Sequence, residues 1–307
     1  MKTCIAALLG TALAWTASAA ELEVVSTLPD LGTVAEVVGG DRVTVTVLCP
    51  GDMDPHFLPA KPSLARKLGK ADALIYNGLE LEVGWLSLLI GKARNPDVKP
   101  GQPGEIDCSE GLSEILEVPE GEVDRSMGDI HPQGNPHYTL DPRRMVEVAA
   151  YLADRFARLD PEGAEAYRAG AADFQRRVEE RLPVWRAAAA GAAERPVILY
   201  HRNWTYLANW LDLMVVGEVE NRPGIAPSPR HVQDLIYQGR HLRNVLILSA
   251  HWDHHDVGEE IAERMGAALV ILPGQTGAQD SPGDWFGLID TITAALAAAA
   301  PPAGEAP

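Results

Sequence analysis

The chain has 307 residues, of which 46% are hydrophobic and 22% charged, so it is long enough for two ordinary domains or one large one. Acidic residues outnumber basic ones 43 to 26, which gives a formal net charge of −17. This excess argues against nucleic acid or an anionic membrane surface as a partner. It is compatible with the attraction of a cation, although acidity by itself indicates only solubility.

The first 20 residues have the pattern of an export signal. Lys2 gives a short positive start, an apolar run follows from Cys4 to Trp15, and residues 17–19 are the small residues of a cleavage site. The run is too short to span a bilayer comfortably. We therefore expect residues 1–20 to be removed and the rest to be a soluble periplasmic protein; the alternative is an uncleaved anchor.

Two cysteines, Cys49 and Cys108, lie beyond this segment. Free thiols are uncommon in exported proteins, so we expect the two to form a disulfide bond; the alternative is a pair of unlinked thiols. Two cysteines cannot build a structural zinc site by themselves.

Short runs with β-sheet character alternate with helical patterns in the first half of the chain. The expected strands are Glu23–Thr27, Val43–Leu48, Ala73–Tyr76 and Glu105–Cys108. The expected helices between them are Asp30–Val38, Ser63–Gly69 and Trp85–Ala93. This alternation predicts βαβ units and a mainly parallel sheet.

Helical patterns occupy the middle of the chain. Pro142–Leu159 reads as a helix that begins after Asp141, and a much longer pattern follows from Asp160 to about Ala190, with Pro183 as a potential kink. The alternation of strands and helices then resumes. The later strands are expected at Val197–Tyr200, Met214–Val219, Asn244–Ser249 and Ala268–Leu272, and the later helices at Trp204–Trp210, His231–Gly239 and Val257–Met265.

These patterns predict an α/β protein of two lobes, each with a mainly parallel β-sheet flanked by helices, joined by one long helix. We expect the N-terminal metal-binding lobe at residues 21–159, the linking helix at 160–193 and the C-terminal metal-binding lobe at 194–307. Residues 118–135 are acidic and contain several Gly and Pro, which predicts a mobile surface loop. Its single histidine, His131, fits a weak zinc scavenger or a docking site for a zinc-delivering partner; a plain solvated loop is the favoured alternative.

Three histidines stand out because each occupies a corresponding loop position. His56 follows the second expected strand, His137 precedes a helix, and His201 follows the first strand of the second half. A single histidine is usually a surface or core residue. Ligands of open α/β sheets bind at the carboxyl ends of strands, and neutral imidazole is a good ligand for zinc. The sequence therefore predicts a metal site between the lobes.

A second histidine group follows the strand that ends near Ser249. His251, His254 and His255 could form a further zinc site, but a polar loop is the favoured interpretation.

Several of these segments resemble one known family when they are taken together. The motifs are Asp54-Pro55-His56 with Pro59, Pro62 and Ser63; Tyr76-Asn77-Gly78-Leu79-Glu80 with Trp85; Pro136-His137 with Asp141-Pro142; Tyr200-His201; and Pro223-Gly224-Ile225 with Pro227-Ser228-Pro229. In this order they resemble the zinc and manganese group of solute-binding proteins of ABC importers, and they extend over most of the chain. Two departures are Thr139, where the family commonly has tryptophan, and Arg202, where an acidic residue is more common.

The resemblance implies a periplasmic receptor that binds Zn²⁺ between two lobes and hands it to the membrane permease of an ABC importer. Zinc members of the family carry histidine as the third ligand and manganese members glutamate, and His201 occupies that position. Nitrogen-rich sites favour zinc over manganese on general grounds as well. The fourth ligand implied is an aspartate late in the chain, for which we choose Asp280; Asp284 and a water molecule are the alternatives.

Other functions remain as alternatives. A manganese receptor, an adhesin and a periplasmic metal buffer could all use the same fold. A zinc hydrolase is disfavoured because the chain has neither H-E-x-x-H nor G-x-S-x-G. We expect a monomer that is not an enzyme and binds no nucleic acid, with a zinc-delivering chaperone as a further candidate partner.

Overall fold

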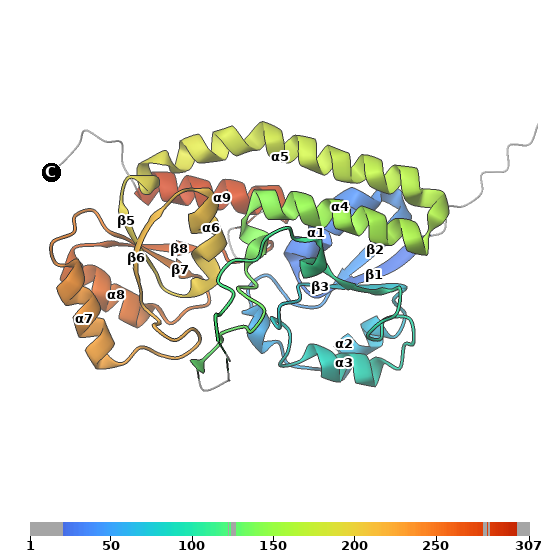
Figure 1. Ribbon diagram of the computed structural model, residues 1–307, viewed down its shortest axis with the longest axis horizontal. Helices are drawn as coiled ribbons and strands as arrows, with labels where there is room; N and C mark the ends of the chain where they lie inside the picture. The colour runs from blue at the N-terminus through green and yellow to red at the C-terminus, as the bar shows by residue number, and fades with distance from the viewer. Residues whose placement is uncertain (1–20, 122, 124–126, 279–280, 282, 300–307) are drawn as a thin grey trace, which may run out of the picture.

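The computed structural model describes residues 21–121, 123, 127–278, 281 and 283–299. Two four-stranded parallel sheets, each flanked by helices, lie side by side beneath a long helix that passes over both (Figure 1). The predicted α/β fold is confirmed. The predicted export signal, residues 1–20, lies outside this range.

The first sheet has the strand order β2-β1-β3-β4. Its strands are β1 (Leu22–Ser26), β2 (Val43–Val47), β3 (Ala73–Tyr76) and β4 (Glu105–Asp107), and its helices are α1 (Pro29–Gly39), α2 (Pro62–Leu68), α3 (Leu86–Ala93) and α4 (Pro142–Leu159). The register places Val24 of β1 beside Val45 on one side and Ala73 on the other. The central strands are apolar on both faces because helices cover both faces of a parallel sheet.

The second sheet repeats this topology with the order β6-β5-β7-β8. Its strands are β5 (Pro196–Leu199), β6 (Met214–Glu218), β7 (Leu246–Ala250) and β8 (Ala268–Leu272), and its helices are α6 (Thr205–Trp210), α7 (Pro229–Gly239), α8 (His255–Met265) and α9 (Trp285–Ala299). Because the carboxyl ends of β1 and β5 both lead into the space between the sheets, the loops after them meet there. Helix α9 was missed by the sequence analysis, which read its alanine run only as helical propensity.

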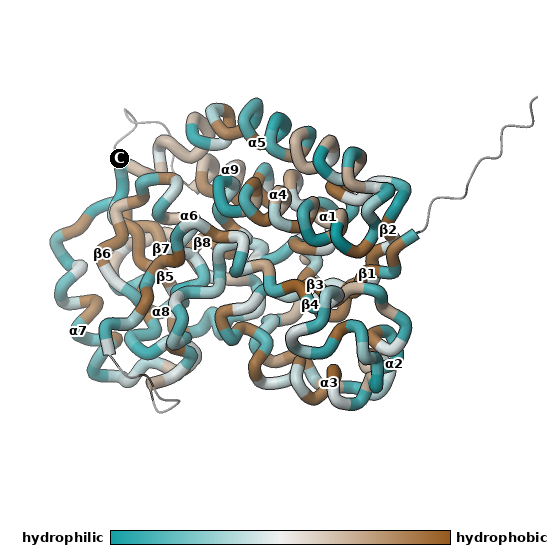
Figure 2. Tube along the Cα trace, turned by 45° about the vertical axis from the view of Figure 1, so that its right-hand side comes forward, coloured by the Kyte–Doolittle hydropathy of each residue, from teal (hydrophilic) through white to brown (hydrophobic). Residues whose placement is uncertain are grey.

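Helix α5 (Ala164–Ala193) has 30 residues and continues through Pro183. At 1.5 Å per residue it is about 45 Å long, enough to cover both sheets. Its buried side chains include Phe174 and Trp185, and they belong to one apolar core that contains Val24 of the first sheet and Leu248 of the second. Figure 2 shows the apolar strands inside and polar turns along the outer side of α5. The two lobes therefore share a core.

The predicted disulfide bond is wrong, because Cys49 and Cys108 are both buried free thiols. Cys49 follows β2 and Cys108 follows β4, and these strands are the two edges of the first sheet. With two strands between them and about 4.8 Å per strand, the thiols are separated by about 14 Å. A disulfide bond requires Cα atoms closer than about 7 Å.

We expect this difference to be visible in a thiol titration of the protein from residue 21 onward. Burial raises the pKa of Cys49 to about 12 and raises that of Cys108 well above its usual value, so neither should react in the native state. Denaturation without a reductant should release two reactive thiols per chain. Release of none would show that the disulfide bond forms after all.

Among the described residues, no helix is both long enough and apolar enough to cross a membrane.

Candidate metal centre

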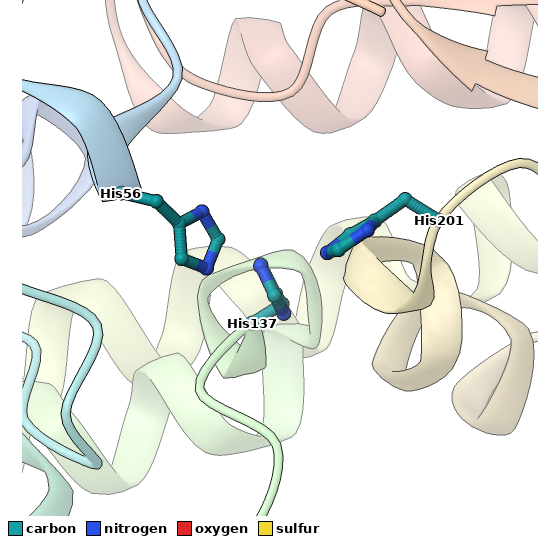
Figure 3. A group of neighbouring side chains, drawn as sticks. All are labelled: His56, His137 and His201. Atoms are coloured by element: carbon teal, nitrogen blue, oxygen red, sulfur yellow. The ribbon is translucent and has the colours of Figure 1, made fainter. Parts of the chain in front are cut away.

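The three histidines singled out by the sequence converge in the space between the sheets (Figure 3). One ligand atom of each of His56, His137 and His201 lies within 4.8 Å of the others. The ring centroids are 5.2 Å apart for His56 and His137, 5.5 Å for His137 and His201, and 6.0 Å for His56 and His201. This is the only group of metal-binding side chains of this size found in the part of the chain that the structure describes.

His56 is positioned by the aspartate two residues before it. Asp54 Oδ1 accepts hydrogen bonds from the His56 backbone N–H at 2.9 Å and from Nδ1 at 2.7 Å. Pro55, between them, has a fixed φ and begins a short 3-10 turn. An aspartate or asparagine side chain that accepts from the backbone two residues ahead is a stable local turn. The Asp-Pro-His sequence thus sets both the backbone and the ring of His56.

His137 is positioned by the same local arrangement with a different residue type. Asn135 Oδ1 accepts from the His137 backbone N–H at 2.9 Å and from its Nδ1 at 2.9 Å. The Asn135 amide in turn donates to Glu117 Oε2 and to the carbonyl oxygen of Arg202. Asn135 was not predicted as a functional residue. The shared pattern of Asp or Asn, then Pro, then His is the signal that would have found it.

His201 is held by a carboxylate distant in sequence. Glu220 Oε2 lies 2.8 Å from His201 Nδ1 and also accepts from the Gly224 N–H. The Glu220 N–H donates to the carbonyl oxygen of Tyr200, which extends the β5–β6 pairing and brings Glu220 alongside. No sequence motif marked Glu220, because its role depends on the register of two strands.

In all three histidines, an oxygen atom occupies Nδ1, and this leaves Nε2 as the ligand atom. His56 Nε2 is buried and has no hydrogen-bond partner among the described residues. A partner that accepts from Nδ1–H fixes the tautomer and makes the free nitrogen a better ligand. A tetrahedral zinc ion with bonds of about 2.05 Å would bring the nitrogens to about 3.3 Å from one another, a modest contraction.

The site is surrounded by acidic side chains. The three imidazoles line a cavity of about 280 Å³ whose other walls include Asp129 and Asp253. Burial raises the pKa of Asp253. For Asp54, burial acts in the same direction, but the hydrogen bonds and charge of His56 outweigh it and lower its pKa. The cavity is therefore suited to a cation.

The two deeply buried histidines are tuned in opposite directions. Burial, together with the neighbouring imidazoles, lowers the pKa of His137 well below its usual value, so this ring is neutral and ready to bind metal. Burial also acts to lower the pKa of His201, but the hydrogen bond and charge of Glu220 outweigh it and raise the pKa. A proton therefore competes with a metal ion mainly at His201.

The other predicted site residues have different positions. Asp280 lies outside the described residues. Asp284 is exposed, and its Oδ1 accepts from the Gly287 N–H at the start of α9. The ring of His131 lies 5.6 Å from that of His56, beside the histidine group but not in it.

The hypothetical second zinc site at 251–255 is not formed by the described residues. His255 Nε2 donates to the carbonyl oxygen of Ala250, His251 contacts the Trp252 ring at 4.5 Å, and His254 is exposed. The favoured interpretation as a polar loop agrees with this arrangement.

Residues 24–299 match the model of one protein family, described as the zinc-uptake complex component A, periplasmic (ZnuA). The chain belongs to this ZnuA family. Its similarity to a crystal structure of ZnuA has a TM-score of 0.73 at 24% identity and covers 92% of this chain and 100% of that one. A manganese-bound periplasmic metal-binding protein of Candidatus Liberibacter asiaticus gives 0.73 at 18% identity over 91% and 100%.

Relatives of this ZnuA-family chain carry metal names in their descriptions. A manganese-binding lipoprotein MntA of Halalkalibacterium halodurans is 30% identical over 53% of this chain and 48% of its own length. A manganese ABC transporter substrate-binding lipoprotein, scaA of Streptococcus gordonii, is 28% identical over 49% and 46%. The chain thus spans about half the length of these curated relatives.

Proposed function

We propose that this protein is a high-affinity zinc-binding receptor. The observation that carries the proposal is the convergence of three imidazoles whose Nδ1 atoms are all hydrogen-bonded to oxygen, so that three Nε2 atoms serve one ion. Zinc prefers nitrogen ligands in a tetrahedral arrangement, whereas manganese prefers carboxylate, carbonyl and water oxygens.

Asp280 is our proposed fourth ligand. It follows the segment that leaves β8, and a carboxylate oxygen would complete a tetrahedron of three nitrogens and one oxygen. Asp284 is less suited because its carboxylate already accepts a hydrogen bond at the start of α9.

The transport role follows from membership in the family together with this site. We propose that residues 1–20 are removed on export, that the loaded monomer hands zinc to the membrane permease of an ABC importer, and that a zinc-delivering chaperone supplies the ion. The lobes are proposed at 21–159 and 194–307, with residues 160–193 as the linking helix.

A receptor is favoured over an enzyme by the carboxylates around the histidines. A catalytic zinc site keeps an open position beside a general base. Asp54 and Glu220, which are both close to the site, already hold histidine Nδ1 atoms. A manganese receptor is the main competing function, because the names of several relatives specify manganese.

A competition titration of the metal-free protein tests this choice. We expect one zinc ion per chain, bound at least ~100-fold more tightly than manganese, because nitrogen donors discriminate between the two ions. Dialysed protein and a chromophoric chelator of known affinity would give both constants. Manganese binding as tight as zinc binding would contradict the proposal, and tight binding of neither ion would remove the receptor function.

A further inference from the structure

A short segment of the second lobe lies directly against the first. Residues 274–278, which follow β8 and which we call the interlobe segment, include the buried residues Gln275 and Thr276. Gln275 Nε2 donates to the carbonyl oxygen of Met53 at 2.8 Å, and the Thr276 N–H donates to Asp30 Oδ1 at 2.7 Å. Both bonds join residues more than 200 positions apart, so they tie the lobes together.

The carboxyl group of Asp30 is unusual in its surroundings. It lies in the first turn of α1 with 0% of its surface exposed, beside the buried apolar residue Leu31. Burial raises its pKa, and the hydroxyl groups of Thr276 and Thr139 lie next to it. A buried carboxyl group is costly unless it makes specific hydrogen bonds. Asp30 thus joins α1, the interlobe segment and the residue two positions after His137.

The loop that leads to His56 is pressed against the same segment. A Cβ atom on Gly51 would lie 2.2 Å from the carbonyl oxygen of Thr276, a distance that only glycine permits. Met53, which accepts the hydrogen bond from Gln275, lies three residues before His56. The first histidine therefore extends from a loop whose position is set by the second lobe.

The spacing of the ligand atoms depends on this contact. His56 and His137 belong to the first lobe and His201 to the second, so a shift between lobes changes the distance from His201 to both others. Zinc bound to nitrogen at about 2.05 Å tolerates little change in this distance. A larger ion with more flexible oxygen coordination is less sensitive to it.

We propose that Asp30 and Gln275 are positioning residues that fix the spacing of the three histidines and so determine the preference for zinc over manganese. This inference rests on the proposed function. It assigns to residues outside the coordination sphere a role in selectivity, in addition to any contribution that they make to stability.

The decisive measurement is the ratio of zinc to manganese affinity in Asp30→Ala, with the metals themselves as probes. We expect zinc affinity to fall ~10- to 30-fold, in the range seen when a residue that supports metal ligands is removed. Manganese affinity should change less than about threefold, because its coordination adapts to looser spacing. Asp30→Asn keeps an oxygen that can accept from the Thr276 N–H and should retain most of the ratio.

Val34→Ala is the matched control for loss of stability. Val34 lies one turn further along α1 and is completely buried in the core of the first lobe. This variant should lower the unfolding temperature without changing the affinity ratio. If Asp30→Ala also lowers the unfolding temperature but keeps the wild-type ratio, the residue is only structural and the inference is overturned.

Gln275→Met gives a second test that leaves Asp30 in place. It removes the bond to Met53 at nearly constant side-chain volume, and we expect the ratio to fall in the same direction. An unchanged ratio in this variant would also contradict the inference. A wild-type preference for manganese would contradict the proposed function as well, whereas a zinc-selective wild type with unaltered variants would contradict only this inference.

Discussion

Replacing His137 by alanine is expected to lower zinc affinity more than ~100-fold, since even residues that only support ligands contribute 10- to 100-fold. His137 lies between the other two histidines, and its lowered pKa keeps it neutral and available for metal over the physiological pH range. Competition titration at neutral pH measures the change.

His254→Ala is the matched control for this variant. His254 lines the same cavity but does not belong to the group of three. Its removal should change zinc affinity by no more than about twofold. Equal affinities for the His137 variant and the wild type would show that the ion binds elsewhere.

Zinc affinity should fall about tenfold per pH unit once His201 binds a proton, because the metal must then displace that proton. Glu220 raises the pKa of His201, so this loss should begin above 6.5, the ordinary value, as the pH is lowered. His137 contributes nothing in this range because its pKa is lowered.

Glu220→Gln should shift the acid limb of this profile to lower pH and reduce affinity 10- to 100-fold at pH 8, because a neutral amide makes His201 less basic. Glu218→Gln is the control, since Glu218 contacts Arg202 rather than a histidine. Zinc titrations from pH 5.5 to 8 measure both profiles. An acid limb that stays in place in Glu220→Gln would rule out His201 as the titrating group.

The strand positions were predictable because each strand is a short apolar run between turn residues. Ala73–Tyr76 and Ala268–Leu272 agree with the structure at both ends. Helix α9 was not predicted, because it is apolar almost throughout and carries little of the periodicity that marks an amphipathic helix.

The site was predictable to the extent that it is local. Asp54 and Pro55 define the surroundings of His56 within three residues, and the resemblance to a known family marked the other two histidines. Glu220 and Asp30 could not be inferred in this way. Their partners are brought to them by strand register and by the contact between lobes, and neither is visible in a linear pattern.

The shared core beneath α5 has a consequence for how the molecule loses its structure. Because side chains such as Phe174 and Trp185 bury surface from both halves, neither half retains a complete interior when it is separated from the other. The two sheets therefore melt as one cooperative unit, in a single calorimetric transition. Although the topology is duplicated, the protein is thermodynamically indivisible, and a fragment that ends before α5 would be a substrate for proteases rather than half a receptor.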